Sequence, residues 1–122
     1  MKTIAVIEDN ADNRLLLGAM LGERYHVAEY EDGPSGLEGL HRQRPDLVLL
    51  DVSLPGMDGP EVLRRIRADA SLRSLPVIAL TAHAMAGDRE RYLALGFNHY
   101  VAKPIVDEDE LLGAIASLLA QR

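Results

Sequence analysis

Five side chains that could do chemistry together each follow, directly or one residue later, a short apolar run: Glu8, Asp9, Asp51, Thr81 and Lys103. Three carboxylates held close together repel one another, which costs stability unless a positive charge offsets the repulsion. Carboxylate oxygens are hard ligands that suit Mg²⁺, the lysine adds a positive charge, and the threonine adds a hydroxyl donor. The set therefore predicts an acidic pocket that takes up a divalent cation and then a phosphoryl group.

The apolar runs themselves predict the strands that position these residues. They recur about twenty to thirty residues apart, a spacing that is too long for hairpins and fits strand–helix–strand crossovers. Two of them are apolar throughout rather than alternating, which is typical of strands covered on both faces in a parallel sheet. The five runs are Ile4–Ile7, Val27–Tyr30, Leu47–Leu50, Val77–Leu80 and Tyr100–Ala102.

Helices are predicted between and after the strands. Asn10 or Asp12 can cap the first, which would bury Leu16, Leu17, Met20 and Leu21, and Asp107 with Glu110 resembles a capping box for the last. The others are expected from about Ser35 to Arg42, from Pro60, and from Ala84 to Leu95, the last held only by Tyr92, Leu93 and Leu95. The pattern indicates one (βα)5 domain of the α/β class over residues 1–122. In such folds ligands bind at the carboxyl ends of the strands.

Composition excludes several functional classes. The chain has 122 residues, a formal net charge of −6 and no cysteine, so we expect neither a disulfide scaffold nor a thiolate metal site. The acidic balance disfavours direct nucleic-acid binding, and the densest basic group, Arg64, Arg65 and Arg67, is interpreted as a solvated helix face. We also expect no membrane span and no signal peptide, hence a cytoplasmic protein.

Several motifs in this order resemble one known family, the CheY-like receiver domains of two-component response regulators. The resemblance extends from Thr3 to Leu119 and rests on the pair Glu8-Asp9, on Asp46–Asp51, on Leu54–Gly59 (LPGMDG), and on Thr81-Ala82 and Lys103-Pro104. It implies a flavodoxin-like fold, a doubly wound parallel sheet of five strands in the order 2-1-3-4-5. It also implies a module that catalyses only its own phosphorylation and dephosphorylation and is not otherwise an enzyme.

The resemblance also implies a role for each residue of the pocket. Asp51 would be the phospho-acceptor, which attacks the phosphohistidine of a histidine kinase or histidine phosphotransfer protein. Asp9, Asp51 and the backbone carbonyl of Ser53 would bind Mg²⁺, for which Mn²⁺ can substitute, and Glu8 would act mainly through a coordinated water. Lys103 would pair with Asp51 and then with a phosphoryl oxygen.

Further roles follow from the same resemblance. Thr81 and Tyr100 would form the switch that transmits phosphorylation, and Ser53 and His83 would tune the lifetime of the phosphate. The Lys103-Pro104 bond is expected to be cis. A downstream protein, or a second copy of the chain, would read the face made by the fourth helix, fifth strand and fifth helix. Tyr100 taken alone is also consistent with an ordinary half-buried strand residue.

Two alternatives stay open on the sequence. A haloacid-dehalogenase-like phosphatase shares the aspartyl phosphate but has a second acid two residues after the first, and Ser53 at that position disfavours it. The chain could also be a receiver segment of a hybrid histidine kinase. Met1 immediately before the first strand favours a stand-alone domain over that segment.

Overall fold

The computed structural model describes residues 1–82, 87–105 and 107–121, in which five strands alternate with five helices. In chain order these are β1 (Thr3–Ile7), α1 (Ala11–Leu21), β2 (His26–Tyr30), α2 (Gly33–Arg42), β3 (Leu47–Asp51), α3 (Gly59–Ala68), β4 (Val77–Thr81), α4 (Asp88–Leu95), β5 (His99–Ala102) and α5 (Glu108–Ala120). Each strand is one residue longer than its predicted apolar run. No helix among the described residues is both long and apolar enough to cross a membrane.

The strands form one parallel sheet in the order β2-β1-β3-β4-β5, so the predicted (βα)5 architecture and strand order are confirmed. The order reverses at β1, because β2 lies on one side of it and β3 on the other. All five carboxyl ends therefore meet at a single edge of the sheet. In folds of this kind that edge, next to the reversal, is the place where ligands bind.

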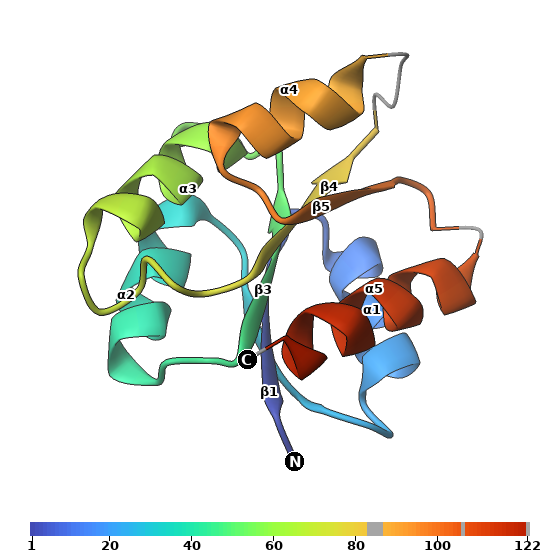
Figure 1. Ribbon diagram of the computed structural model, residues 1–122. Helices are drawn as coiled ribbons and strands as arrows, with labels where there is room; N and C mark the ends of the chain where they lie inside the picture. Colours follow the sequence, from blue (N-terminus) through green and yellow to red (C-terminus); the bar gives the residue numbers. More distant parts are fainter. Residues whose placement is uncertain (83–86, 106, 122) are drawn as a thin grey trace.

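The sheet separates two apolar layers. Figure 1 shows α1 and α5 on one side and α2, α3 and α4 on the other. Alternate residues of the strands feed each layer: Val48 and Leu50 of β3 pack toward α2 and α3, while Leu47 and Leu49 pack toward α1 and α5. Every residue of β3 and β4 is buried, as expected for strands with helices on both faces.

Side-chain caps fix where four of the helices begin. The residue before each of these helices accepts a hydrogen bond from the backbone N–H three residues further along, which satisfies a group that the first helical turn leaves unpaired. The first cap is Asn10 rather than Asp12, and α2 begins at Gly33, earlier than predicted, because Asp32 caps it. The four caps are Asn10, Asp32, Asp58 and Asp107.

The fourth helix differs most from its prediction. Residues 84–86 of the predicted helix lie outside the described part of the chain, and α4 begins at Asp88 after Gly87, which offers no side-chain cap. Leu93 and Leu95 were predicted to anchor it but are exposed. Tyr92 alone of the three is buried, and its ring packs edge-on against Phe97.

One residue of α1 also differs from its prediction: Leu16 is 44% exposed, although it was expected to be buried.

Arg67 also departs from the predicted solvated face of α3. Its half-buried guanidinium donates hydrogen bonds to the carbonyl oxygens of Gly96 at 2.9 Å and Leu75 at 2.7 Å, and to the Asn98 side chain at 2.9 Å. Arg67 therefore connects the end of α3 to the segment before β4 and to the turn between α4 and β5. Arg64 and Arg65 remain exposed and pair with Glu61.

A histidine in α2 and an aspartate directly after α3 form a pair. We predict that the contribution of this pair to the free energy of unfolding depends on pH. His41 Nε2 lies 2.5 Å from Asp69 Oδ2, and this hydrogen bond raises the pKa of His41. Hydrogen bonds from Ser71 and from His41 lower the pKa of Asp69 to about 2. The pair therefore stabilises the fold fully between about pH 4 and pH 6.5, and its contribution is lost as pH rises through the folded-state pKa of His41.

We expect His41→Gln to unfold at lower urea concentration than the wild type at pH 5.5 and at nearly the same concentration at pH 9. The matched control is Arg42→Gln, which removes an exposed pair with Glu38 in the same helical turn and should have the same small effect at both pH values. An equal loss for His41→Gln at pH 5.5 and pH 9 would contradict the prediction.

Candidate functional site

The ends of β1, β3 and β5 bring four of the predicted site residues together. Glu8 and Asp9 follow β1, Asp51 is the last residue of β3, and Lys103 follows β5. Backbone hydrogen bonds fix these ends to neighbouring strands: Glu8 N donates to the Tyr30 carbonyl at 3.0 Å, and Lys103 N donates to the Thr81 carbonyl at 2.7 Å. The positions of the side chains are thus set by the sheet rather than by flexible loops.

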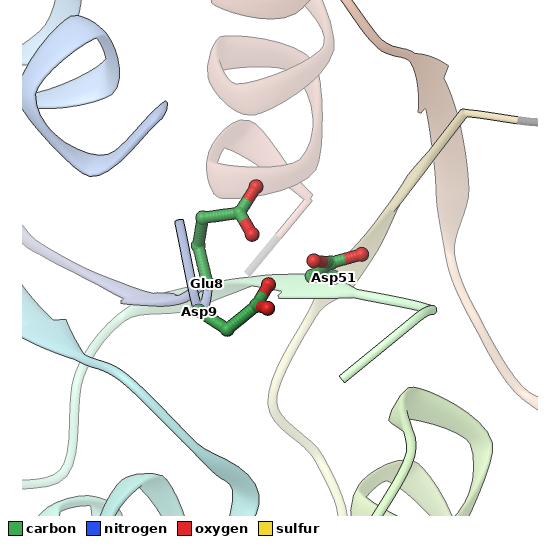
Figure 2. A group of neighbouring side chains, drawn as sticks. All are labelled: Glu8, Asp9 and Asp51. Carbon is green, nitrogen blue, oxygen red and sulfur yellow. The ribbon is translucent and has the colours of Figure 1, made fainter. Parts of the chain in front are cut away.

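The three carboxylates form a compact cluster. Glu8, Asp9 and Asp51 each offer an oxygen, and these oxygens lie within 4.8 Å of one another. Figure 2 shows the side chains gathered at the ends of two adjacent strands, with Asp9 directed toward Asp51. Glu8 is fully buried and Asp51 is 2% exposed, whereas Asp9 faces solvent. The cluster is open on the Asp9 side, where a small ligand can enter.

Lys103 supplies the positive charge that the cluster needs. Its Nζ lies 3.0 Å from Glu8 Oε1 and 3.2 Å from Asp51 Oδ2, so one ammonium group bridges the two buried carboxylates. Asn13 Nδ2 of α1 donates a further hydrogen bond of 3.1 Å to Glu8 Oε1. The prediction paired Lys103 with Asp51 alone; the structure adds Glu8 as an equally close partner.

Burial and hydrogen bonding shift the pKa values of the two buried acids in opposite directions. Burial, reinforced by a hydrogen bond with Asp51, raises the pKa of Glu8 to about 7 even though Lys103 opposes the shift. Burial also acts to raise the pKa of Asp51, but hydrogen bonds from Glu8 and from the Ser53 N–H, together with Lys103, outweigh it and lower that pKa. The pKa of Asp51 is therefore lower than that of Glu8, and of the two buried acids Glu8 takes up a proton more easily.

The donor set fits a hard divalent cation. Three carboxylates converge, two of them removed from water, and a single lysine does not neutralise them. Oxygen-only ligands with solvent access on one side are the environment in which Mg²⁺ binds while keeping some of its waters. No nitrogen or sulfur ligand lies in the cluster of described residues that would favour zinc.

The loop after β3 is held close to Asp51 by Gly59. A β-carbon at this position would lie 2.5 Å from the Asp51 carbonyl oxygen, so only glycine permits the first turn of α3 to pack there. Gly59 N donates to the Val52 carbonyl at 3.0 Å, and Ser53 N donates to Asp51 Oδ1 at 2.9 Å. The backbone of Ser53 therefore lies beside the Asp51 carboxylate, and the loop that follows returns to the end of β3 through Gly59.

Thr81 and Tyr100 are linked through a residue for which the sequence suggested only a packing role. The buried Thr81 hydroxyl lies 3.1 Å from the Tyr92 hydroxyl, and the Tyr92 ring lies 5.8 Å from the Tyr100 ring. Tyrosine in an otherwise polar helix was the available signal, but its partner is eleven residues away in the sequence. His83 lies outside the described residues. The Lys103-Pro104 peptide bond is cis, as predicted.

Comparison with known proteins identifies the family. The sequence model of one protein family, the response regulator receiver domain, matches residues 4–116, and the chain belongs to this family. The response regulator PleD of Caulobacter vibrioides is 40% identical over 116 residues, which are 94% of this chain and 25% of PleD. The polar-differentiation response regulator DivK of Brucella anthropi is 38% identical over 105 residues, 85% of each chain.

A solved structure supports the same assignment. The receiver domain of the sensor histidine kinase PA1611 from Pseudomonas aeruginosa, with a magnesium ion in its active-site cleft, matches with a TM-score of 0.88 and 39% identity over 98% of both chains. The chain spans between 12% and 25% of the length of the first curated relatives that it matches. The similar proteins thus include stand-alone regulators and segments of longer ones.

The family assignment explains why three acids are grouped at this edge of the sheet. Glu8, Asp9 and Asp51 fit the phosphorylation site of a receiver domain, a signalling module that takes phosphoryl groups from histidine kinases. The haloacid-dehalogenase-like alternative is not favoured.

The bridging position of Lys103 predicts that its loss destabilises the protein. In Lys103→Met the buried carboxylates lose their common counter-charge, and we expect the free energy of unfolding to fall by roughly 3 kcal/mol in the presence of EDTA. Adding Asp51→Asn should recover part of that loss, because it removes the ionised acid. Urea unfolding gives the values, and Lys2→Met, an exposed lysine, is the control. Equal stability of Lys103→Met and the control would show that Lys103 does not neutralise the cluster.

Proposed function

We propose that the protein is a phospho-accepting receiver in which Asp51 is the acceptor. The observation that carries the proposal is the buried Asp51 carboxylate held between Lys103 at 3.2 Å and the other two acids, which together with the lowered pKa of Asp51 favours a charged acceptor. An Asp51 oxygen attacks the phosphorus of a phosphohistidine, the P–O bond forms as the P–N bond breaks, and the histidine nitrogen leaves and takes up a proton. Water later hydrolyses the acyl phosphate, so the domain catalyses only its own phosphorylation and dephosphorylation.

Asp9, Asp51 and the backbone carbonyl of Ser53 are proposed as the ligands of Mg²⁺, with Glu8 acting through a coordinated water. Mn²⁺ has the same preference for oxygen ligands and should substitute. The bound ion supplies charge neutralisation for the incoming phosphoryl group. The chain itself contributes Lys103, whose ammonium group already lies against Asp51 and can follow the negative charge onto a phosphoryl oxygen.

Thr81 and Tyr100 are proposed to convert phosphorylation into a change of surface. The Thr81 hydroxyl would hydrogen-bond a phosphoryl oxygen, and the half-buried Tyr100 ring would repack beside it, so that one of two packings is stabilised. The face formed by α4, β5 and α5 would then change its affinity for a downstream protein or a second copy of the chain. Ser53, which is exposed beside the acceptor, and His83 are proposed to set the phosphate lifetime.

The proposed context is a cytoplasmic phosphorelay. The phosphoryl donor would be a histidine kinase or a histidine phosphotransfer protein, and the output would pass through protein contact rather than direct nucleic-acid binding. We propose that residues 1–122 form a single receiver domain, either as a stand-alone regulator or as the receiver segment of a hybrid kinase. The resemblance to PleD, to DivK and to the PA1611 receiver supports this context.

The acceptor assignment is tested by mass spectrometry after incubation with acetyl phosphate and Mg²⁺. The wild type should gain one phosphoryl group, and none in EDTA, whereas Asp51→Asn should gain none. The matched control is Asp58→Asn, a nearby aspartate that caps α3 and can be replaced by another good cap without loss of the helix. Phosphorylation of Asp51→Asn at the wild-type rate would refute the assignment.

The metal site is tested by thermal unfolding. Because Mg²⁺ binds the folded arrangement of the acids and not the unfolded chain, a hundredfold excess over its dissociation constant should add about 2.7 kcal/mol to the free energy of unfolding. Asp9→Asn should lose most of this gain while folding normally, since Asp9 is exposed. Asp12→Asn, an exposed acid in the first turn of α1, should keep it. A full Mg²⁺ response in Asp9→Asn would remove Asp9 from the ligand set.

A further inference from the structure

The loop between β1 and α1, residues 8–10, presents two of the three acids, and the two are held in different ways. The Glu8 carboxylate is held through its own oxygens, with Lys103 Nζ at 3.0 Å from Oε1. The exposed Asp9 carboxylate has no hydrogen bond or ion pair with any other residue that the structure describes. The place of Asp9 beside Asp51, visible in Figure 2, is therefore set by the backbone of the loop.

Arg14 of α1 holds the peptide unit from which Asp9 begins. Its Nη1 donates a hydrogen bond of 2.7 Å to the carbonyl oxygen of Glu8. The direction of this bond is fixed by chemistry, because a guanidinium group only donates and a carbonyl oxygen only accepts. The peptide bond is planar, so the carbonyl group of Glu8 and the amide nitrogen of Asp9 move as one unit. By holding the oxygen, Arg14 orients the start of the Asp9 backbone.

Backbone hydrogen bonds anchor the loop on both sides of this peptide unit. On the β1 side, Glu8 N donates to the Tyr30 carbonyl at 3.0 Å. On the α1 side, the backbone N–H of Arg14 donates to the Asn10 carbonyl at 3.0 Å. The Arg14 side chain reaches the peptide unit that lies between these two anchors. It thus completes the set of contacts that defines the path of the loop.

Arg14 is itself held, and its charge has an effect opposite to that of its hydrogen bond. The side chain is only 19% exposed, and its Nε lies 3.7 Å from Glu29 Oε1 of β2. A positive charge in contact with the Glu8 backbone repels a cation that binds to the acids. A hydrogen bond that holds Asp9 in place favours the same cation. The two roles of Arg14 therefore predict changes of opposite sign when it is replaced.

We propose that Arg14 is a positioning residue for the metal site: its bond to the Glu8 carbonyl holds Asp9 toward Asp51 and so increases the affinity for Mg²⁺. The inference rests on the proposed role of Asp9 as a ligand of Mg²⁺. When an ion binds one arrangement of a loop, its apparent affinity falls with the fraction of protein in that arrangement. Arg14 keeps this fraction high before the ion arrives.

The experiment measures the dissociation constant of Mg²⁺ by calorimetry on the folded protein. Arg14→Met keeps a long apolar stem and removes both the charge and the donor. We expect it to bind Mg²⁺ about fivefold more weakly, the effect of losing one hydrogen bond. Arg14→Lys keeps the charge and can donate one hydrogen bond to the Glu8 carbonyl. It should bind Mg²⁺ more tightly than Arg14→Met, although its positive charge repels the ion.

Two control variants separate the bond to the Glu8 carbonyl from other effects. Glu29→Gln removes the ion pair but not the hydrogen bond, and its dissociation constant should stay within about twofold of the wild type. Arg24→Met removes an exposed arginine that follows α1, and it should bind Mg²⁺ as the wild type does. Urea unfolding in EDTA gives the stability of each variant, on which a dissociation constant measured on folded protein does not depend.

A spectroscopic measurement without metal tests the same contact directly. The ¹⁵N relaxation order parameter of the Asp9 amide reports motion of the loop on the picosecond to nanosecond timescale. We expect it to fall in Arg14→Met and to stay at the wild-type value in Arg24→Met. A role of Arg14 in overall stability alone would leave this order parameter unchanged.

Several results would overturn the inference. Among them are Mg²⁺ binding by Arg14→Met as tight as that of the wild type or of Arg14→Lys, and an unchanged order parameter at Asp9. Tighter binding by Arg14→Met would show that Arg14 acts through its charge, and an equal weakening in Glu29→Gln would assign the effect to the ion pair. Each leaves the proposed function intact as long as the wild type binds Mg²⁺ and is phosphorylated at Asp51. Failure of the wild type to bind Mg²⁺ would instead refute the proposed metal site and this inference with it.

Discussion

The bridge from Lys103 to Glu8 and Asp51 is the interaction on which the site depends. Two acids with almost no solvent contact cannot both be ionised side by side without a counter-charge, since the interior screens their repulsion poorly. The lysine meets both at about 3 Å, and Glu8 retains a proton at a pH where an exposed glutamate would not. This arrangement lowers the pKa of Asp51 although its burial acts to raise it.

The aliphatic sheet makes that arrangement possible. β3 and β4 are buried on both faces, and the ends of β1, β3 and β5 are hydrogen-bonded to their neighbours, so the charged side chains project from fixed backbone positions. Side chains held in this way lose little entropy when a ligand arrives. Gly59 extends the same rigidity to the loop after β3, because it lets the start of α3 pack against the Asp51 backbone.

The site and the proposed output face lie at opposite ends of a short chain of contacts. Thr81 ends β4 beside the acidic edge, Tyr92 meets its hydroxyl from α4, and Tyr100 meets the Tyr92 ring from β5. α4 itself has little other apolar anchorage, since Leu93 and Leu95 are exposed. A helix held mainly through one tyrosine can shift at small cost, which is compatible with the output role proposed for α4.

The sequence by itself determined the five strands, the (βα)5 order and the grouping of Glu8, Asp9, Asp51 and Lys103, because continuous apolar runs and strand-end positions are local features. It also supplied the helix cap at Asp107 and left the first cap to either Asn10 or Asp12, of which the structure shows Asn10. Tertiary structure alone decided that Glu8 shares Lys103 with Asp51, that Arg67 is half-buried, and that Tyr92 bonds to Thr81. These contacts join residues that are distant in the chain. The spacing of apolar residues predicts which face of an element is buried, but it does not predict which distant partner a polar side chain will contact. Burial then raises the pKa of Glu8, a shift that depends on the surroundings of the carboxyl group and not on residue type alone.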